Sequence, residues 1–194
     1  GLSEEKQAEL REINAQIASL TQKIGNNILA ESNAFKDKFG FSVSSYPSMM
    51  TTTEDRELRR QYNEAYRMRG HNGNEYDNRE LILSLVGARI RKANILGYKN
   101  SASFTLSDKM AENPQTVDAF LKGIMDAATV RAKQEVKEMQ RFMDEDIASG
   151  KLAKGSKIEQ WDWWYYAEKV RRQKYDLDED AVSKYFKAEN VLNG

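Results

Sequence analysis

The sequence predicts an all-α protein, a multi-helix bundle of about six or seven helices with one long helix near residues 114–149. Three observations support this fold class. Apolar residues recur every three or four positions along most of the chain, as on one face of an amphipathic helix. The β-branched residues are scattered, whereas strands would show alternation. Only two prolines occur among the 194 residues, so few positions interrupt a helix.

The first helix is expected near the N-terminus, where six apolar residues step by three or four positions. They are Leu10, Ile13, Ile17, Leu20, Ile24 and Ile28. The pattern breaks at residues 35–53, where Gly, Ser, Pro and Thr collect and the apolar residues follow no helical period. We therefore expect an irregular loop, or a join between two helical parts, in this range.

Residues that are typical of helix ends indicate the helices that follow. Thr53 can cap a helix whose first turn is rich in acidic residues. Asp77 and Glu80 resemble a capping pair ahead of the next helix, and Gly97 can end that helix in a left-handed conformation. A short helix is then expected within residues 101–110.

The long helix has the clearest start signal in the chain. Asn113 followed by Pro114 is a cap and a first-turn proline, and Gly150 is expected to end the helix. Its apolar stripe consists of Val117, Leu121, Ile124, Ala128, Ala132, Val136, Met139, Met143 and Ile147. After a linker and an aromatic segment, Asp178 is expected to cap a last short helix that runs through Phe186.

Composition excludes several classes of protein. Thirty basic residues balance thirty acidic ones, so no net field would recruit nucleic acid or an anionic membrane. The absence of cysteine excludes disulfides, thiolate zinc sites and cysteine nucleophiles. No apolar run approaches the roughly 20 residues that span a bilayer. The acidic, polar N-terminus shows no signal peptide, and the chain is compatible with a cytoplasmic or an exported protein.

Familiar catalytic motifs are missing from the sequence. His71 is the only histidine, so a zinc site built on two or three histidines cannot form. It lies in a turn rich in Gly and Asn, which favours a solvated surface loop over a hydrolase that uses His71. The carboxylate clusters at 143–150 and 176–180 lack the alternating ladder of a calcium loop. We therefore predict no catalytic, cofactor-binding or metal-binding residue in this chain.

All three tryptophans lie in one charged stretch, residues 159–186, which also holds four tyrosines. If the segment is helical, Trp161, Trp164 and Tyr165 share one face, whereas Trp163 and Tyr166 lie on another. Aromatic side chains on two faces predict burial against more than one neighbour. Two interpretations stay open here, a helical core and the wall of a groove or interface.

Four strings of the sequence together carry a family resemblance. They are NNILAESNAF (26–35), DRELRRQYNEAYRMRG (55–70), YDNRELILSLVGARIRKANILGYKNSASFTLSDKMAENPQTVDAFL (76–121) and WDWWYYAEKVRRQKYDLDEDAVSKYFKAENVLNG (161–194). In order and spacing they resemble the thimet-oligopeptidase and peptidyl-dipeptidase (oligopeptidase A-like) family of zinc metallopeptidases. The resemblance covers most of the chain.

The resemblance implies that residues 1–194 are a single helical region, upstream of the catalytic core of a peptidase that hydrolyses short peptides. Such a region would form a wall of the substrate channel and pack on the zinc-bearing part, which is the implied partner. The family's H-E-x-x-H motif, whose histidines bind zinc, has no counterpart here. The chain alone is therefore expected to be inactive and free of zinc. Family members also carry a longer helical insertion near residues 36–45.

The resemblance suggests five positions near the cleft or interface, without a catalytic role. They are Trp161, Asp162, Tyr165, Tyr166 and Tyr175. An aromatic face that normally meets a catalytic part would be exposed in this chain and would promote self-association. The alternative is a stand-alone helical binding or scaffold protein of the same origin, without catalysis. In the family, the residues that determine whether the enzyme removes C-terminal dipeptides or cleaves internally lie mainly outside this region.

Overall fold

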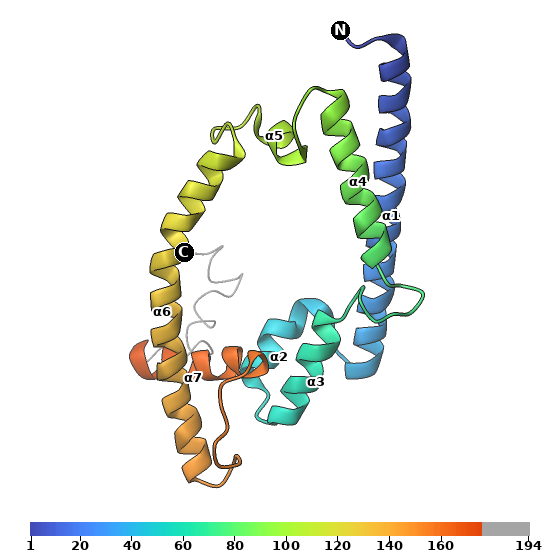
Figure 1. Cartoon of the computed structure of the whole chain (residues 1–194). Helices are drawn as coiled ribbons and strands as arrows, with labels where there is room; N and C mark the ends of the chain where they lie inside the picture. Colours follow the sequence, from blue (N-terminus) through green and yellow to red (C-terminus); the bar gives the residue numbers. More distant parts are fainter. Residues whose placement is uncertain (176–194) are drawn as a thin grey trace, which may run out of the picture. The chain divides into compact units, whose positions relative to one another are not determined.

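The structure is a computed structural model that describes residues 1–175, and these residues contain seven α-helices, two 3₁₀ turns and no strand (Figure 1). The α-helices are α1 (Glu4–Phe39), α2 (Tyr46–Thr52), α3 (Arg56–Arg67), α4 (Arg79–Ile95), α5 (Ser101–Leu106), α6 (Pro114–Ala148) and α7 (Trp163–Tyr175). The 3₁₀ turns are η1 (Val43–Ser45) and η2 (Gln160–Asp162). The all-α prediction is confirmed, and the last helix predicted from Asp178 lies outside the described residues.

The chain divides into two compact units. Among the described residues, unit 1 contains 1–43 and 64–128, and unit 2 contains 44–63 and 129–175. Each unit is therefore assembled from segments that are separated in the sequence. The expectation of one continuous helical region stays a prediction.

Unit 1 is built on the packing of α1 along α4. Ile13 of α1 is buried, as are Ala88 and Ala93 of α4. α1 ends at Gly40, which has φ +78° and donates its N–H to the Lys36 carbonyl at 2.8 Å. This left-handed cap is the conformation that glycine adopts at least cost.

The prediction of an irregular loop at residues 35–53 is wrong for most of that range. α1 continues to Phe39, and α2 follows after η1. The Phe35 ring contacts the rings of Phe39 and Phe41 with centroids 4.9 and 5.3 Å away, so aromatic packing holds the end of α1. Pro47 lies in the first turn of α2, where a missing N–H costs no intrahelical bond.

The predicted cap at Thr53 is also corrected. The Thr53 N–H donates to the Met49 carbonyl at 3.0 Å, so Thr53 closes α2. Asp55 caps α3 instead, because its Oδ1 accepts from the backbone N–H groups of Glu57 and Leu58 at 2.8 and 3.1 Å.

The predicted capping pair of Asp77 and Glu80 does not form, because Asn78 stands at the start of α4 without a side-chain cap. Three other predicted termini are confirmed. Asn113 Oδ1 accepts from the Thr116 N–H at 2.9 Å directly before Pro114 begins α6. Gly97 and Gly150 follow the ends of α4 and α6 with φ +86° and +79°. The short helix α5 falls within the range expected for it.

A buried carboxylate fixes the loop between α3 and α4 in unit 1. Glu31 of α1 is 6% exposed and accepts hydrogen bonds from the Gly70 N–H, Asn72 Nδ2 and Asn74 Nδ2, the last two at 2.7 and 2.9 Å. Burial of this carboxylate opposes its ionisation, but the three donors outweigh burial and lower the pKa of Glu31. His71 stands exposed in the same loop, as expected.

Gly70 is the tightest backbone position of unit 1. Its φ is +75°, and a Cβ there would lie 2.8 Å from Asn78 Nδ2 and from Ile28 Cδ1. Asn78 is itself 1% exposed and accepts from Asn27 Nδ2 at 2.9 Å. The loop therefore requires a residue without a side chain at position 70.

Within residues 1–175, no helix combines the length and the apolar character that crossing a membrane requires.

Candidate functional site around the aromatic helix

The aromatic segment begins with a reciprocal cap in unit 2. The Glu159 N–H donates to Asp162 Oδ2 at 3.1 Å, and the Asp162 N–H donates to the Glu159 carbonyl at 3.0 Å. This capping box forms η2, and α7 starts at the next residue, Trp163. The segment EQWD therefore sets where the aromatic helix begins.

Asp162 is a fully buried carboxylate that holds two arginines of α3. Arg56 donates from Nη2 at 2.8 Å and from Nε at 3.1 Å, and Arg59 donates from Nη2 at 3.0 Å. Asp162 is 0% and Arg59 is 1% exposed. The hydrogen bond to Asp162 raises the pKa of Arg56, so the Arg56 guanidinium remains charged opposite the carboxylate.

Arg59 uses its remaining donors on backbone carbonyls. Its Nη1 donates to Thr53 and Glu54 at 2.8 and 2.9 Å, and its Nε donates to Trp161 at 3.2 Å. The guanidinium also lies over the Tyr165 ring, 4.1 Å from the centroid. Arg59 therefore ties the α2–α3 connection to the start of the aromatic helix.

A second buried carboxylate, Asp146 of α6, also contacts α7. It accepts from the Tyr166 hydroxyl at 2.9 Å and from Lys169 Nζ at 2.7 Å. Burial opposes ionisation of Asp146, but these two donors outweigh it and lower its pKa. Burial and the neighbouring Asp146 carboxylate raise the pKa of Tyr166, so the phenol stays protonated and acts as a donor.

Asp146 and the two arginines that hold Asp162 line a polar cleft of about 510 Å³. Its lining residues are Glu54, Asp55, Arg56, Glu57, Arg59, Asp146, Lys151, Leu152, Tyr165 and Tyr166. The charged groups of both signs and the two phenol rings suit a polar ligand that also carries apolar parts.

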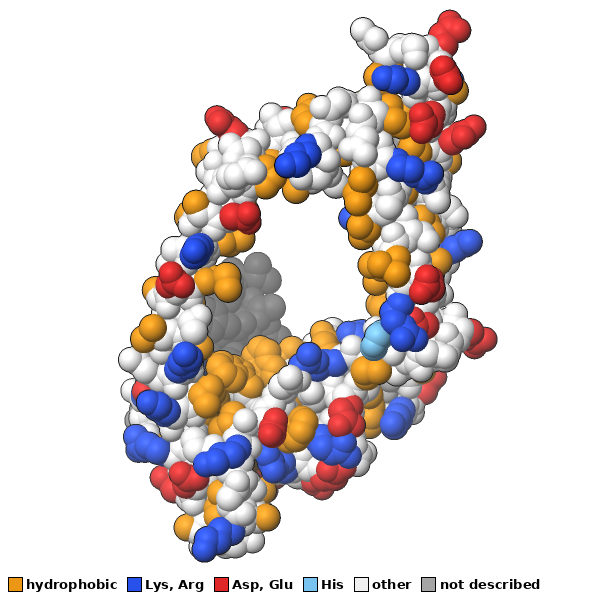
Figure 2. All heavy atoms as spheres, viewed as in Figure 1, with side chains coloured by type: hydrophobic (Ala, Val, Ile, Leu, Met, Phe, Trp, Pro, Cys, Tyr) orange, Lys and Arg blue, Asp and Glu red, His pale blue; other side chains and the backbone are white. Residues whose placement is uncertain are grey.

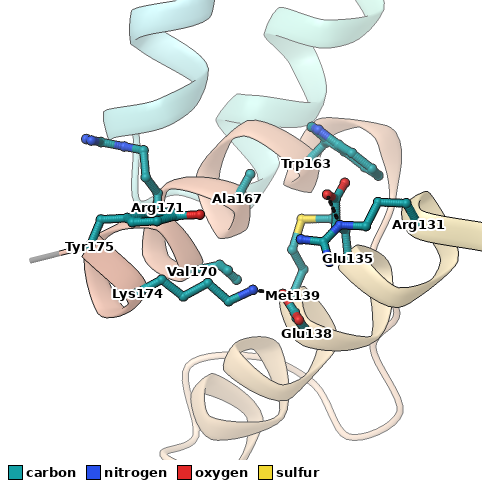
Figure 3. Close-up of a pocket in the computed structure, with 10 residues that line it drawn as sticks. All are labelled: Arg131, Glu135, Glu138, Met139, Trp163, Ala167, Val170, Arg171, Lys174 and Tyr175. Atoms are coloured by element: carbon teal, nitrogen blue, oxygen red, sulfur yellow. Dashed lines mark hydrogen bonds and ion pairs between the residues drawn. The ribbon is translucent and has the colours of Figure 1, made fainter. Parts of the chain in front are cut away.

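A smaller groove of about 240 Å³ runs between α6 and α7 (Figure 3). Its floor is apolar and includes Met139, Ala167 and Val170. Two ion pairs stand at its rim, one within α6 between Arg131 and Glu135 at 2.9 Å, and one from Lys174 to Glu138 at 2.6 Å. Trp163 and Tyr175 complete the lining.

The structure places the five predicted cleft or interface residues in different surroundings. Asp162 is buried against the arginines, and Trp161 is partly buried with the Arg56 guanidinium 6.0 Å from its ring centroid. Tyr165 and Tyr166 line the polar cleft. Tyr175 is apart from them, because it lines the smaller groove and is 65% exposed. Their assignment to a cleft or interface stays a prediction.

Burial does not follow the two faces predicted for the aromatic helix, because Trp163 and Tyr166 were predicted on one face and differ in exposure. Tyr166 packs with Met139 and Met143 in the core of unit 2, whereas Trp163 and Trp164 are 38% and 46% exposed. Part of the aromatic run is therefore core, and part of it is open to a neighbour.

Sequence reasoning missed Arg56, Arg59 and Asp146 as functional or structural centres. The string DRELRR contained a signal, because arginines three positions apart lie on one face of a helix and can grip one carboxylate together. Their partner could not be chosen from the sequence, since Asp162 is 103 residues beyond Arg59.

The residues present do not fit a zinc site. Within residues 1–175, no three His, Cys, Asp or Glu side chains gather where they could hold a metal ion. The whole sequence has one histidine and no cysteine, and Asp146 and Asp162 are both paired with cationic side chains. We therefore assign no metal ligand among residues 1–175.

The chain matches the sequence model of a known protein family. The model for "Peptidase family M3" matches residues 49–194, three quarters of the sequence. The chain belongs to peptidase family M3. This family depends on zinc in general, so the resemblance drawn from the four strings is confirmed at the family level.

Two relatives match nearly the whole chain, and a third matches part of it. Oligopeptidase A of Haemophilus influenzae is 28% identical over 229 residues, covering 100% of this chain and 33% of the relative. Dipeptidyl carboxypeptidase of Salmonella typhimurium is 29% identical over 224 residues, covering 98% and 32%. Dipeptidyl carboxypeptidase of Escherichia coli is 38% identical over 117 residues, covering 60% and 16%.

The chain spans about a third of the length of the first two relatives. Both matches extend over more residues than the 194 of this chain, so the relatives carry residues that have no counterpart here. The expectation that such an insertion falls near residues 36–45 stays a prediction.

Proposed function

We propose that this chain is the helical part of a zinc-dependent M3 oligopeptidase or peptidyl-dipeptidase that hydrolyses short peptides. One observation carries the proposal, the family match over residues 49–194. The catalytic zinc and the groups that activate its water would then belong to a part of the protein that this chain does not contain.

The contribution of this chain is to build a wall of the substrate channel. The polar cleft beside α7 offers charges of both signs and two phenol rings. A short peptide presents charged termini, backbone amides and apolar side chains, and a lining of this kind can contact all of them. A channel wall also excludes folded proteins, so that short peptides are the substrates.

The buried ion pairs give this wall its rigidity. Asp162 and Arg59 are almost wholly buried and hold α3 against the start of α7. Groups locked by such partners keep their positions when a ligand arrives, which limits the entropy lost on binding. We therefore assign Arg56, Arg59 and Asp162 a positioning role.

The test is to join this chain to the remaining two thirds of Haemophilus influenzae oligopeptidase A, in place of the third that it matches. The chain alone should hold no stoichiometric zinc and should not hydrolyse a short peptide. The joined protein should bind zinc and hydrolyse short peptides, but should leave a folded protein intact. Zinc content by mass spectrometry and product formation by chromatography measure these outcomes.

Matched variants of the joined protein test the wall itself. Asp162→Asn should lower peptide hydrolysis without loss of zinc, whereas Asp118→Asn, an exposed aspartate of α6, should leave it unchanged. Stoichiometric zinc or peptide hydrolysis by the chain alone would contradict the proposal. A joined protein that binds zinc without hydrolysing peptides would favour the stand-alone binding protein.

A further inference from the structure

The long helix α6 carries one apolar stripe with two different environments. Toward its C-terminal end, Met139 and Met143 are 2% and 0% exposed and form the core of unit 2 with Tyr166. Toward its N-terminal end, every residue from 118 to 131 is exposed. Figure 2 shows hydrophobic side chains, in orange, along this exposed part of α6.

Four large apolar side chains dominate the exposed part. They are Phe120, Leu121, Ile124 and Met125, with exposed fractions of 68%, 47%, 50% and 62%. At 3.6 residues per turn they occupy an arc of roughly 140°. Lys122 and Asp126 lie on the opposite side. An apolar arc of this width opposite a charged face is typical of a helix that packs on a core.

The exposed apolar face of α6 is expected to be covered by a partner. The side chains form a continuous apolar surface, and such surfaces on a soluble protein usually meet a partner. The surface also continues the stripe that is already an interface at Met139 and Met143. Ala128 and Ala132 connect the two parts of the stripe, and small residues allow a second helix to approach closely.

We propose that the face formed by Phe120, Leu121, Ile124 and Met125 docks an apolar helix face from the zinc-bearing part of the same polypeptide. This inference rests on the proposed function. The relatives supply the length for such a partner, because this chain spans 33% and 32% of two of them. A partner helix with apolar residues at three- and four-residue spacing fits the stripe.

A second copy of the chain is a poorer occupant. Four partly exposed side chains offer less than the roughly 800 Å² that each partner buries in a standard stable interface. Within one polypeptide the same contact needs no such area, because the two parts are already tethered.

The lack of cysteine makes the test specific. Ile124→Cys places a single thiol in the docking face, and Val130→Cys places one on the opposite side of α6, at a residue that is 60% exposed. In the chain alone, a maleimide should label both variants at similar rates. In the joined protein, the Ile124→Cys thiol should react roughly tenfold or more slowly, because buried groups react only through local opening. The Val130→Cys thiol should keep its rate.

The outcomes separate this inference from the proposed function. Equal labelling rates in a joined protein that binds zinc and hydrolyses peptides would overturn the docking and leave the function intact. Protection of Ile124→Cys without peptide hydrolysis would support the docking and count against the function. Protection in the chain alone that rises with its concentration would overturn the inference in favour of a second copy.

A second measurement does not depend on thiol chemistry. In the joined protein, Ile124→Asp should lower the melting temperature, because it places a charge in the buried face. Val130→Asp should change it little. Equal melting temperatures for the two variants would overturn the docking.

Discussion

Two carboxylates, one in each unit, are buried by different means. Asp162 of unit 2 is opposed by the full charges of Arg56 and Arg59. Glu31 of unit 1 is 6% exposed, and its hydrogen-bond donors are a backbone N–H and the side-chain amides of Asn72 and Asn74. Both carboxylates fix a connection between helices, but one does so with ions and the other with dipoles.

The two units should differ in how much stability they lose when the buried carboxylate is removed. Removal of one member of a buried ion pair leaves an uncompensated charge in a region of low dielectric constant. Removal of a carboxylate held by neutral donors leaves only unsatisfied N–H groups, some of which can reach water. Unit 2 should therefore lose more stability than unit 1 when its central carboxylate is altered.

The largest effect is expected for Asp162→Asn. The amide cannot balance Arg59, which is 1% exposed, so the free energy of unfolding should fall by about 3–5 kcal/mol. Urea denaturation followed by tryptophan fluorescence measures the loss, because all three tryptophans lie close to residue 162. Asp118→Asn is the control and should change the free energy by less than about 0.5 kcal/mol. A loss below that control range for Asp162→Asn would contradict the ionic interpretation of unit 2.

A smaller effect is expected for Gly70→Ala, which disturbs the donor side of the Glu31 cluster. The added Cβ would lie 2.8 Å from Asn78 Nδ2 and Ile28 Cδ1, at φ +75°. Backbone strain and crowding together should cost about 2–4 kcal/mol. Gly40→Ala is a matched control, since its φ is +78° and its Cβ would meet nothing within 4 Å. The excess over Gly40→Ala in thermal unfolding isolates the crowding, and equal losses would show that the close approach at Gly70 is unimportant.

Glu31→Ala should cost less again. The three donors lose their acceptor, and the free energy of unfolding should fall by about 1–3 kcal/mol. Hydrogen exchange at residues 70–78 should accelerate, because the loop loses its anchor in α1. Glu12→Ala alters an exposed glutamate of the same helix and should leave these amides unchanged. Unchanged exchange in Glu31→Ala would contradict the anchoring role.

The smallest expected effect is on the stability of the folded chain at acidic pH. The pKa of Glu31 is lowered from its ordinary 4.5, so its ionised form stabilises the folded state. This contribution is fully present above the unfolded pKa and is lost as the pH falls through the folded pKa. Glu31→Gln should therefore flatten the dependence of stability on pH below about pH 4.5 and leave it unchanged near pH 7. An identical acid limb in Glu31→Gln and the wild-type chain would refute the assignment.

The helices and most of their termini could be predicted from the sequence, because these features depend on neighbouring residues. Asn113 and Pro114 start α6 through a local hydrogen bond and a fixed φ. The short helix α2 was missed, because seven residues are too few to show a period and Pro47 suggested a loop. A proline in a first turn is equally a start signal.

The candidate site was less predictable for a physical reason. Its Asp162 centre joins residues about a hundred positions apart, and periodicity carries no information about which helix meets which. Asp162 was selected from the family resemblance, whereas Arg59 and Asp146 were not selected at all. An arginine in a charged string and an aspartate in an acidic run look solvated until their partners are known.

The separation of 103 positions between Arg59 and Asp162 has a consequence for how the chain folds during synthesis. α1 and α4, which pack together in unit 1, are complete once residue 95 has been made. Arg59 enters the growing chain long before its counter-charge and stays hydrated until residue 162 leaves the ribosome. Closing so long a loop costs entropy before any contact repays it. Unit 2 is thus the late-folding part of the molecule, and a chain halted before residue 162 would keep a folded unit 1 beside unpaired arginines.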